Sequence, residues 1–270
     1  SQLCELTGET EVSNQALYNY VYFHVIPSPG TIYKNIEKLK PGECVEFKNG
    51  SVNKHSYWHQ TFSEAHIPLQ SLEEELKDTL TASVNEVMSG TEKVGAFLSG
   101  GLDSTTVSGL LAQHSRERVS AYTIGFDVKE YDESGYARIA AERFGLDHHI
   151  YYVTPEDVLK SLPIVATGWE EPFGNSSALP AYFCALHAKS NGIELMLAGD
   201  GGDEIFGGNE RYVKQYIFDL YQRLPKLIRL GLIEPGLRGA PGRDRVPVIR
   251  KINSYVAQAN TPLPDRLQSY

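Results

Sequence analysis

The chain has 270 residues, of which 41% are hydrophobic and 22% are charged, and its formal net charge is −9. This composition predicts a globular chain with one large domain, or one domain and a smaller unit. The acidic balance argues against a broad nucleic-acid surface, and no apolar run approaches the roughly 20 residues that cross a bilayer.

Cysteine usage and the N-terminal sequence favour a cytoplasmic location. Cys4, Cys44 and Cys184 lie far apart and show no paired spacing. That pattern suits a reducing interior, and it does not suggest zinc or a redox pair. The N-terminus has no basic-then-apolar signal layout, so secretion is not expected.

Residues 14–60 have the pattern of a small β-rich unit. Asn14–Phe23 reads as a short helix, Pro27–Gly30 ends it, and Thr31–Tyr33 is β-prone. Gly42–Phe47 and Ser51–Trp58 flank Lys48-Asn49-Gly50, which is typical of a hairpin turn. The unit is too short to bury a large core of its own.

Helical and strand patterns alternate between residues 69 and 198. Apolar residues at helical spacing predict a helix over Leu69–Met88, followed by a short apolar strand that ends near Leu98. Further helices are expected at Ser104–His114, Glu133–Phe144, Pro155–Thr167 and Ala178–Ser190, and strands at Val119–Phe126, His149–Val153 and Ile193–Ala198. This alternation predicts an α/β fold, a twisted parallel sheet with helices on both faces.

The turn after the first of these strands reads Ser99-Gly100-Gly101-Leu102-Asp103-Ser104. Adjacent glycines let several backbone N–H groups point at one anion, and the helix that follows adds the positive end of its dipole. The lysine of the common nucleotide loop is missing, and Asp103 would repel a phosphate unless a cation lay between them. A nucleotide with Mg²⁺ therefore explains the turn better than an ordinary tight turn in which Asp103 or Ser104 caps the helix.

A second glycine-rich and acidic turn, Gly199–Gly208, ends the last predicted strand. Glycine and aspartate are common in solvated loops, which is the plainer interpretation. Ligands of parallel sheets nevertheless bind beyond the carboxyl ends of the strands, where both turns are expected. We therefore expect the carboxylates of the two turns to form one metal site beside the phosphates.

The stretch Arg229–Lys251 is locally basic. Its arginines Arg238, Arg243, Arg245 and Arg250 are interleaved with glycine and proline. We interpret this stretch as an irregular, solvated loop and not as a nucleic-acid surface.

In sum, these segments resemble the asparagine synthetase family, within the ATP pyrophosphatases whose phosphate loop reads Ser-Gly-Gly-x-Asp-Ser. The resemblance covers about residues 14–225, and the two glycine-rich turns are its most specific parts. It implies an adenine nucleotide alpha hydrolase-like fold. The segments that carry it are Ser99–Ser104, Tyr122–Phe126, Tyr131–Glu133 with Tyr136-Ala137, Glu170–Phe173, Ser177–Pro180 and Gly199–Gly208.

The resemblance implies a role for each residue of the two turns. Ser99, Gly100, Gly101 and Ser104 would hold the pyrophosphate part of ATP. Asp103 and Asp203 would bind Mg²⁺. Leu98, Ile124, Ala198 and Gly199 would contact the adenosine through backbone and apolar groups. Asp200 stands where asparagine synthetases carry an acidic residue proposed to act on the attacking amine, whereas β-lactam synthetases carry a tyrosine there.

The same resemblance predicts a domain boundary between residues 65 and 66. Residues 1–65 look like the end of a glutaminase domain with its linker, but the N-terminal cysteine nucleophile has no counterpart, because the chain begins with Ser1 and Cys4 is not terminal. Glutamine hydrolysis is therefore not expected. Residues 66–270 would be a C-terminally incomplete synthetase domain, because only 62 residues follow Gly208. Lys214, Lys226 and Lys251 are interpreted as surface side chains and not as the lysine with which the family stabilises its transition states.

The function that the resemblance implies is ATP-dependent amide formation. ATP would be cleaved between its α and β phosphates, with AMP passing to a carboxylate, most simply aspartate, and ammonia forming the amide. A ligase for another acid, such as a β-lactam-synthetase-like enzyme, and an ATP-binding module without turnover stay open as alternatives. The expected partners are these small molecules, a glutaminase domain in cis or in trans, and a second copy in a homodimer, with no nucleic acid or membrane. We expect the chain alone to bind ATP with Mg²⁺ but to synthesise little amide.

Overall fold

The structure is a computed structural model that describes residues 2–63, 66–90, 93–128, 130, 132–239, 246–262 and 266. Ser1, Tyr131, Arg243 and Arg245, which were considered above, lie outside these ranges. The chain divides into two compact units, residues 1–199 and residues 200–270.

The first unit begins with a small segment that contains two helices and a hairpin: α1 (Gln2–Thr7), α2 (Asn14–Phe23), β1 (Glu43–Lys48) and β2 (Ser51–Ser56). Helix α2 has the predicted bounds, and the Ser13 side chain caps it by accepting a hydrogen bond from the Ala16 N–H. Asn49 and Gly50 turn the hairpin with φ values of 51° and 77°, as the sequence predicted. Thr31–Tyr33 forms no strand, and Tyr33 makes only an isolated bridge to Val12.

The rest of the first unit is an α/β layer structure. Its elements are α3 (Leu69–Met88), β3 (Val94–Phe97), α4 (Leu102–His114), β4 (Ser120–Phe126), α5 (Ser134–Phe144), β5 (Asp147–Val153), α6 (Pro155–Gly168), α7 (Ala178–Ser190) and β6 (Leu195–Leu197). The four strands form one parallel sheet in the order β5-β4-β3-β6. Both α4 and β5 begin two residues before their predicted starts.

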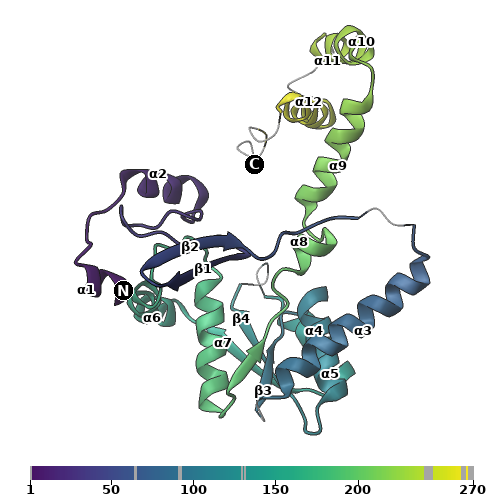
Figure 1. Ribbon diagram of the computed structural model, residues 1–270. Helices are drawn as coiled ribbons and strands as arrows, with labels where there is room; N and C mark the ends of the chain where they lie inside the picture. Colours follow the sequence, from purple (N-terminus) through teal and green to yellow (C-terminus); the bar gives the residue numbers. More distant parts are fainter. Residues whose placement is uncertain are drawn as a thin grey trace. The chain divides into compact units, whose positions relative to one another are not determined.

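Successive residues of the central strands face opposite layers of helices, so the predicted α/β fold is confirmed. Ala96, Leu98 and Ala121 pack with apolar residues of α3, α4 and α5. Phe97 and Tyr122 pack with α7 on the other face. Figure 1 shows α7 on one side of the sheet and α3, α4 and α5 on the other.

The strand order places one reversal at the centre of the sheet. From β3 the chain steps outward to β4 and β5, then returns so that β6 lies on the other side of β3. Ala96 of β3 pairs with Leu197 of β6, so the two strands end side by side. In doubly wound sheets the ligand crevice lies at such a reversal, beyond the carboxyl ends of the strands.

The second unit is helical. Its elements are α8 (Gly202–Phe206), α9 (Glu210–Arg223), α10 (Lys226–Ile228), the π-helical turn η1 (Arg229–Ile233), α11 (Glu234–Arg238) and α12 (Pro247–Asn260). The prediction of an irregular loop over Arg229–Lys251 is therefore wrong for its described residues. Pro235 and Pro247 lie in the first turns of α11 and α12, where proline starts helices instead of breaking them.

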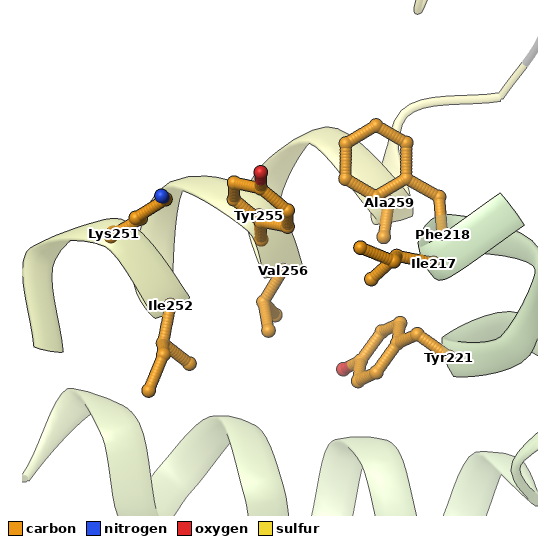
Figure 2. A pocket seen from close by; sticks show the side chains of 8 residues that line it. All are labelled: Ile217, Phe218, Tyr221, Lys251, Ile252, Tyr255, Val256 and Ala259. Carbon is orange, nitrogen blue, oxygen red and sulfur yellow. The ribbon is translucent and has the colours of Figure 1, made fainter. Parts of the chain in front are cut away.

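Helices α9 and α12 pack against each other and leave an apolar hollow of about 360 Å³ (Figure 2). The rings of Phe218 and Tyr255 meet edge to face, with centroids 5.6 Å apart. Arg266 is buried beside them, with its guanidinium 5.3 Å from the Phe218 ring centre and bonded to the carbonyl of Ala259. None of the helices in the described part of the chain combines the length and apolar character needed to cross a bilayer.

Candidate functional site

The loop between β3 and α4 is closed by its own serines. Ser104 Oγ accepts a hydrogen bond from the Ser99 N–H at 3.2 Å and lies 2.9 Å from Ser99 Oγ. The N–H of Gly101 donates to Ser99 Oγ at 3.2 Å. These bonds join the two ends of the loop, so its backbone is held in a defined conformation before any ligand binds.

Two glycines allow the loop to lie against neighbouring backbone. Gly100 has φ of +85°, and a Cβ there would lie 2.5 Å from the backbone nitrogen of Ala137, at the start of α5. A Cβ on Gly199, which follows β6, would lie 2.7 Å from the backbone nitrogen of Ser104. The structure thus brings Gly199 and the Ser99–Ser104 loop together, although almost 100 residues separate them in sequence.

The start of α4 offers unpaired donors to a ligand. Gly101 is the N-cap and supplies no side-chain cap, so the N–H groups of Leu102, Asp103 and Ser104 have no partner within the helix. Together with the helix dipole they favour an anion. Asp103 is half-buried in this first turn, where a carboxylate also interacts favourably with the dipole.

Residues beneath the loop extend the site into the sheet. Leu98 is 1% exposed, and its N–H donates to the Tyr122 carbonyl at 3.0 Å. Its own carbonyl accepts a hydrogen bond from the hydroxyl of Thr123, and that hydroxyl lies 2.8 Å from His148 Nε2. Burial, followed by the positive charge of Arg138, lowers the pKa of His148.

Neither Thr123 nor His148 was predicted as part of the site. The available signal was a polar residue on the same face of two neighbouring strands, Thr123 on the buried strand β4 and His148 on the half-buried edge strand β5. Ile124, which was predicted, is half-buried on the opposite face of β4 and packs with Tyr122.

The second glycine-rich turn continues into the second unit. Asp200 is exposed, and Asp203 lies exposed in the first turn of the five-residue helix α8. Gly201 and Gly207 flank this helix with φ of +89° and +69°. Because Asp103 and Asp203 belong to different units, their pairing at one metal ion stays a prediction.

The metal that the sequence predicts at this site is Mg²⁺, a cation that binds oxygen ligands. Within the described ranges, no three His, Cys, Asp or Glu side chains gather as a metal site. Mg²⁺ usually needs only one or two carboxylates, because phosphate oxygens and water complete its six ligands. Asp103, the acidic residue in the first turn of α4, would meet that requirement if the Ser99–Ser104 loop binds phosphate.

The N-terminal segment contacts the loop after α6. Lys38 Nζ lies 2.6 Å from Glu171 Oε2 and also bonds the Ile26 carbonyl. The N–H of Gly174 donates to the carbonyl of His24 at 3.0 Å. Beside these contacts lies a hollow of about 600 Å³, whose lining includes the whole family-like segment Glu170–Phe173.

The prediction that the lysines of the second unit are surface side chains holds for two of the three. Lys226 and Lys251 are exposed, as predicted, and Lys251 Nζ lies 6.0 Å from the ring centre of Tyr255 (Figure 2). Lys214 is half-buried on α9, so its interpretation as a plain surface side chain is not confirmed.

Two family models match the chain. The model for asparagine synthase matches residues 75–267, and the model for a glutamine amidotransferase domain matches residues 2–58. The first covers the whole parallel sheet and most of the helical unit.

Two curated relatives are asparagine synthetases, in agreement with the first family model. A putative glutamine-hydrolysing asparagine synthetase 2 of Methanocaldococcus jannaschii is 34% identical over 84% of this chain and 44% of its own length. Asparagine synthetase 1 of Bacillus subtilis is 27% identical over 96% of this chain and 40% of its own. The chain thus spans less than half the length of both relatives.

Among solved structures, a glutamine-dependent NAD⁺ synthetase of Acinetobacter baumannii, in complex with ADP, aligns loosely. The alignment covers 76% of this chain and 48% of that one, with 15% identity and a TM-score of 0.38.

Proposed function

The chain belongs to the asparagine synthase family, and from that premise we propose that it provides the ATP site of a synthetase that adenylates a carboxylate and forms an amide. One observation carries this proposal. The Ser99–Ser104 loop and Gly199 meet where the strand order reverses, which is where such sheets bind nucleotides.

The loop is suited to the pyrophosphate part of ATP. The first N–H groups of α4 supply fixed donors, and Gly100 and Gly101 carry no side chain that would keep a phosphate from the backbone. The hydroxyls of Ser99 and Ser104 orient the loop and can turn toward an anion. Asp103, together with Asp203 in this proposal, would hold Mg²⁺, which offsets the negative charge on the departing pyrophosphate.

The adenosine would lie over the strand ends on either side of this loop. Leu98 follows β3, Ile124 lies in the second half of β4, and Ala198 and Gly199 follow β6. Leu98 is buried, Ile124 and Gly199 are half-buried and Ala198 is exposed, and apolar side chains and backbone groups of this kind suit a planar base and its ribose.

The chemistry has two balanced steps. A substrate carboxylate oxygen attacks the α-phosphorus, the bond to the β-phosphate bridge breaks, and pyrophosphate leaves. An amine then attacks the acyl carbon, AMP leaves, and a base accepts the proton that the amine loses. We assign that base to Asp200, and an aspartate at this position favours amide formation over the ring closure of β-lactam synthetases, which carry a tyrosine there.

We further propose that residues 1–65 are the end of a glutaminase-type domain with its linker, and that residues 66–270 belong to the synthetase domain. The amidotransferase match over residues 2–58 supports this division. The bridge between Lys38 and Glu171 would then join the two parts.

Exchange of labelled pyrophosphate into ATP tests the proposal. We expect exchange that requires Mg²⁺ and aspartate, and no exchange in the Asp103→Ala variant. Exchange with a different acid would replace aspartate and keep the reaction type. ATP binding without exchange, with every acid tried, would overturn the ligase assignment for this chain.

A further inference from the structure

A chain of hydrogen bonds runs from β5 through β4 to the entrance of the phosphate loop. It begins at His148 Nε2, passes through the hydroxyl of Thr123, and ends at the carbonyl of Leu98. Thr123 and Leu98 are 4% and 1% exposed, so the bond between them is shielded from water, whereas His148 is half-buried.

The direction of each bond follows from the chemistry of the groups. A carbonyl only accepts, so the single hydroxyl proton of Thr123 must point at Leu98. The Thr123 oxygen then accepts from His148, which requires the proton of the imidazole to sit on Nε2. The geometry therefore fixes the tautomer of His148 as well as the rotation of the hydroxyl.

The carbonyl of Leu98 and the N–H of Ser99 belong to one planar peptide unit. Thr123 holds the oxygen of this unit from the sheet side, and Ser104 Oγ holds its N–H at 3.2 Å from the loop side. Rotation of the unit would break both bonds. The direction in which the chain leaves β3 is thus set by a side chain on the neighbouring strand.

We propose that Thr123 and His148 are positioning residues for the phosphate loop, acting on ATP through the Leu98–Ser99 peptide. This inference rests on the proposed function, because it assumes that the loop binds the phosphates of ATP. Neither residue touches the nucleotide, and neither takes part in the chemical steps.

The variant Thr123→Val tests the proposal, because valine keeps the shape and removes the hydroxyl. We expect its dissociation constant for ATP with Mg²⁺ to rise about tenfold, the effect expected from losing one buried hydrogen bond and leaving a carbonyl unpaired. Thr123→Ser keeps the hydroxyl and should stay within about twofold of the wild type. His148→Leu removes only the outer bond and should give a smaller rise than Thr123→Val.

Thr31→Val is the matched control. Thr31 is also buried, and its hydroxyl donates to the Ile36 carbonyl at 2.7 Å in the N-terminal segment. Its loss should lower the melting temperature to a similar extent while ATP affinity stays unchanged. If Thr123→Val lowers the melting temperature but binds ATP as tightly as the wild type, Thr123 is merely structural and the proposal is wrong.

Hydrogen exchange separates this inference from the proposed function. In the protein without nucleotide, amides of residues 98–104 should exchange faster in Thr123→Val than in the wild type or in Thr31→Val. Failure of the wild type to bind ATP would overturn the proposed function and the effect of Thr123 on ATP, but faster exchange of residues 98–104 in Thr123→Val would still show that Thr123 positions the loop. Unchanged exchange in residues 98–104 would overturn the positioning role, whatever the ATP affinity.

Discussion

The two glycine-rich turns have similar composition, but they differ in how their backbones are held in place. The Ser99–Ser104 loop follows the buried residue Leu98, closes on itself through two serines and lies against the backbone of α5. The turn from Asp200 to Gly208 surrounds a five-residue helix with no buried residue, and the side chain of Ile205 is 73% exposed. The first turn is held by its surroundings, whereas glycine conformations shape the second. We infer that the first turn binds by pre-formed shape and the second contributes through its carboxylates.

The largest difference is expected from alanine at the two positive-φ glycines. Gly100 and Gly201 have nearly equal φ values, +85° and +89°, so both substitutions carry the same backbone strain. Only at Gly100 does the new Cβ meet backbone atoms, of Tyr136 and Ala137. Gly100→Ala should therefore lower the free energy of unfolding by more than about 3 kcal/mol, and Gly201→Ala by about 1 kcal/mol.

Urea denaturation of both variants measures this difference. Equal losses of stability would show that the Ser99–Ser104 loop can move away from α5 as easily as the second turn adapts, and the contrast between the turns would fail.

An intermediate effect is expected from neutralising one carboxylate in each turn. Asp103→Asn should weaken Mg²⁺-dependent ATP binding by about thirtyfold, or about 2 kcal/mol, because a charged ligand to the metal is lost. Asp200→Asn should bind ATP within about twofold of the wild type and abolish any amide formation. Titration calorimetry with ATP and Mg²⁺, with amide formation assayed in parallel, distinguishes the two roles.

A different result would contradict each of the two carboxylate predictions. Unchanged ATP affinity in Asp103→Asn would remove the metal assignment of Asp103. Amide synthesis by Asp200→Asn at the wild-type rate would remove the catalytic role of Asp200.

The smallest expected effect is on the pH dependence of stability. It arises from His148, which bonds Thr123 beneath the Ser99–Ser104 loop. The pKa of His148 is lowered from its ordinary 6.5, mainly by burial. The unfolded chain therefore takes up the proton first, so stability is complete above about pH 6.5 and declines as the pH falls toward the folded-state pKa. His148→Gln, which keeps an N–H donor, should flatten the pH dependence of the unfolding free energy between pH 7 and 5. A slope equal to that of the wild type would show that His148 does not titrate in this range.

Most helices and strands of the first unit were predictable because their signals are local. The periodicity of Leu69–Met88 and the Asn49-Gly50 turn depend on neighbours in sequence, and both predictions are confirmed. The stretch Arg229–Lys251 was misread because arginine, glycine and proline suggested a loop. Helix α12 starts inside this stretch but continues beyond it. Its helical signal is the apolar spacing of Ile252, Tyr255 and Val256, which lies after the last basic residue of the stretch.

The sequence by itself determined the Ser99–Ser104 turn, the place of Asp103 in it and the order of most helices and strands in the first unit, since turn chemistry and periodicity are properties of short segments. Only the tertiary structure decided that β6 lies beside β3, so that Gly199 meets the start of α4. The same holds for the bonds from His148 through Thr123 to Leu98, which join three strands. Such pairings depend on how the two apolar faces of the sheet pack against their helices, and no short segment of sequence carries that information.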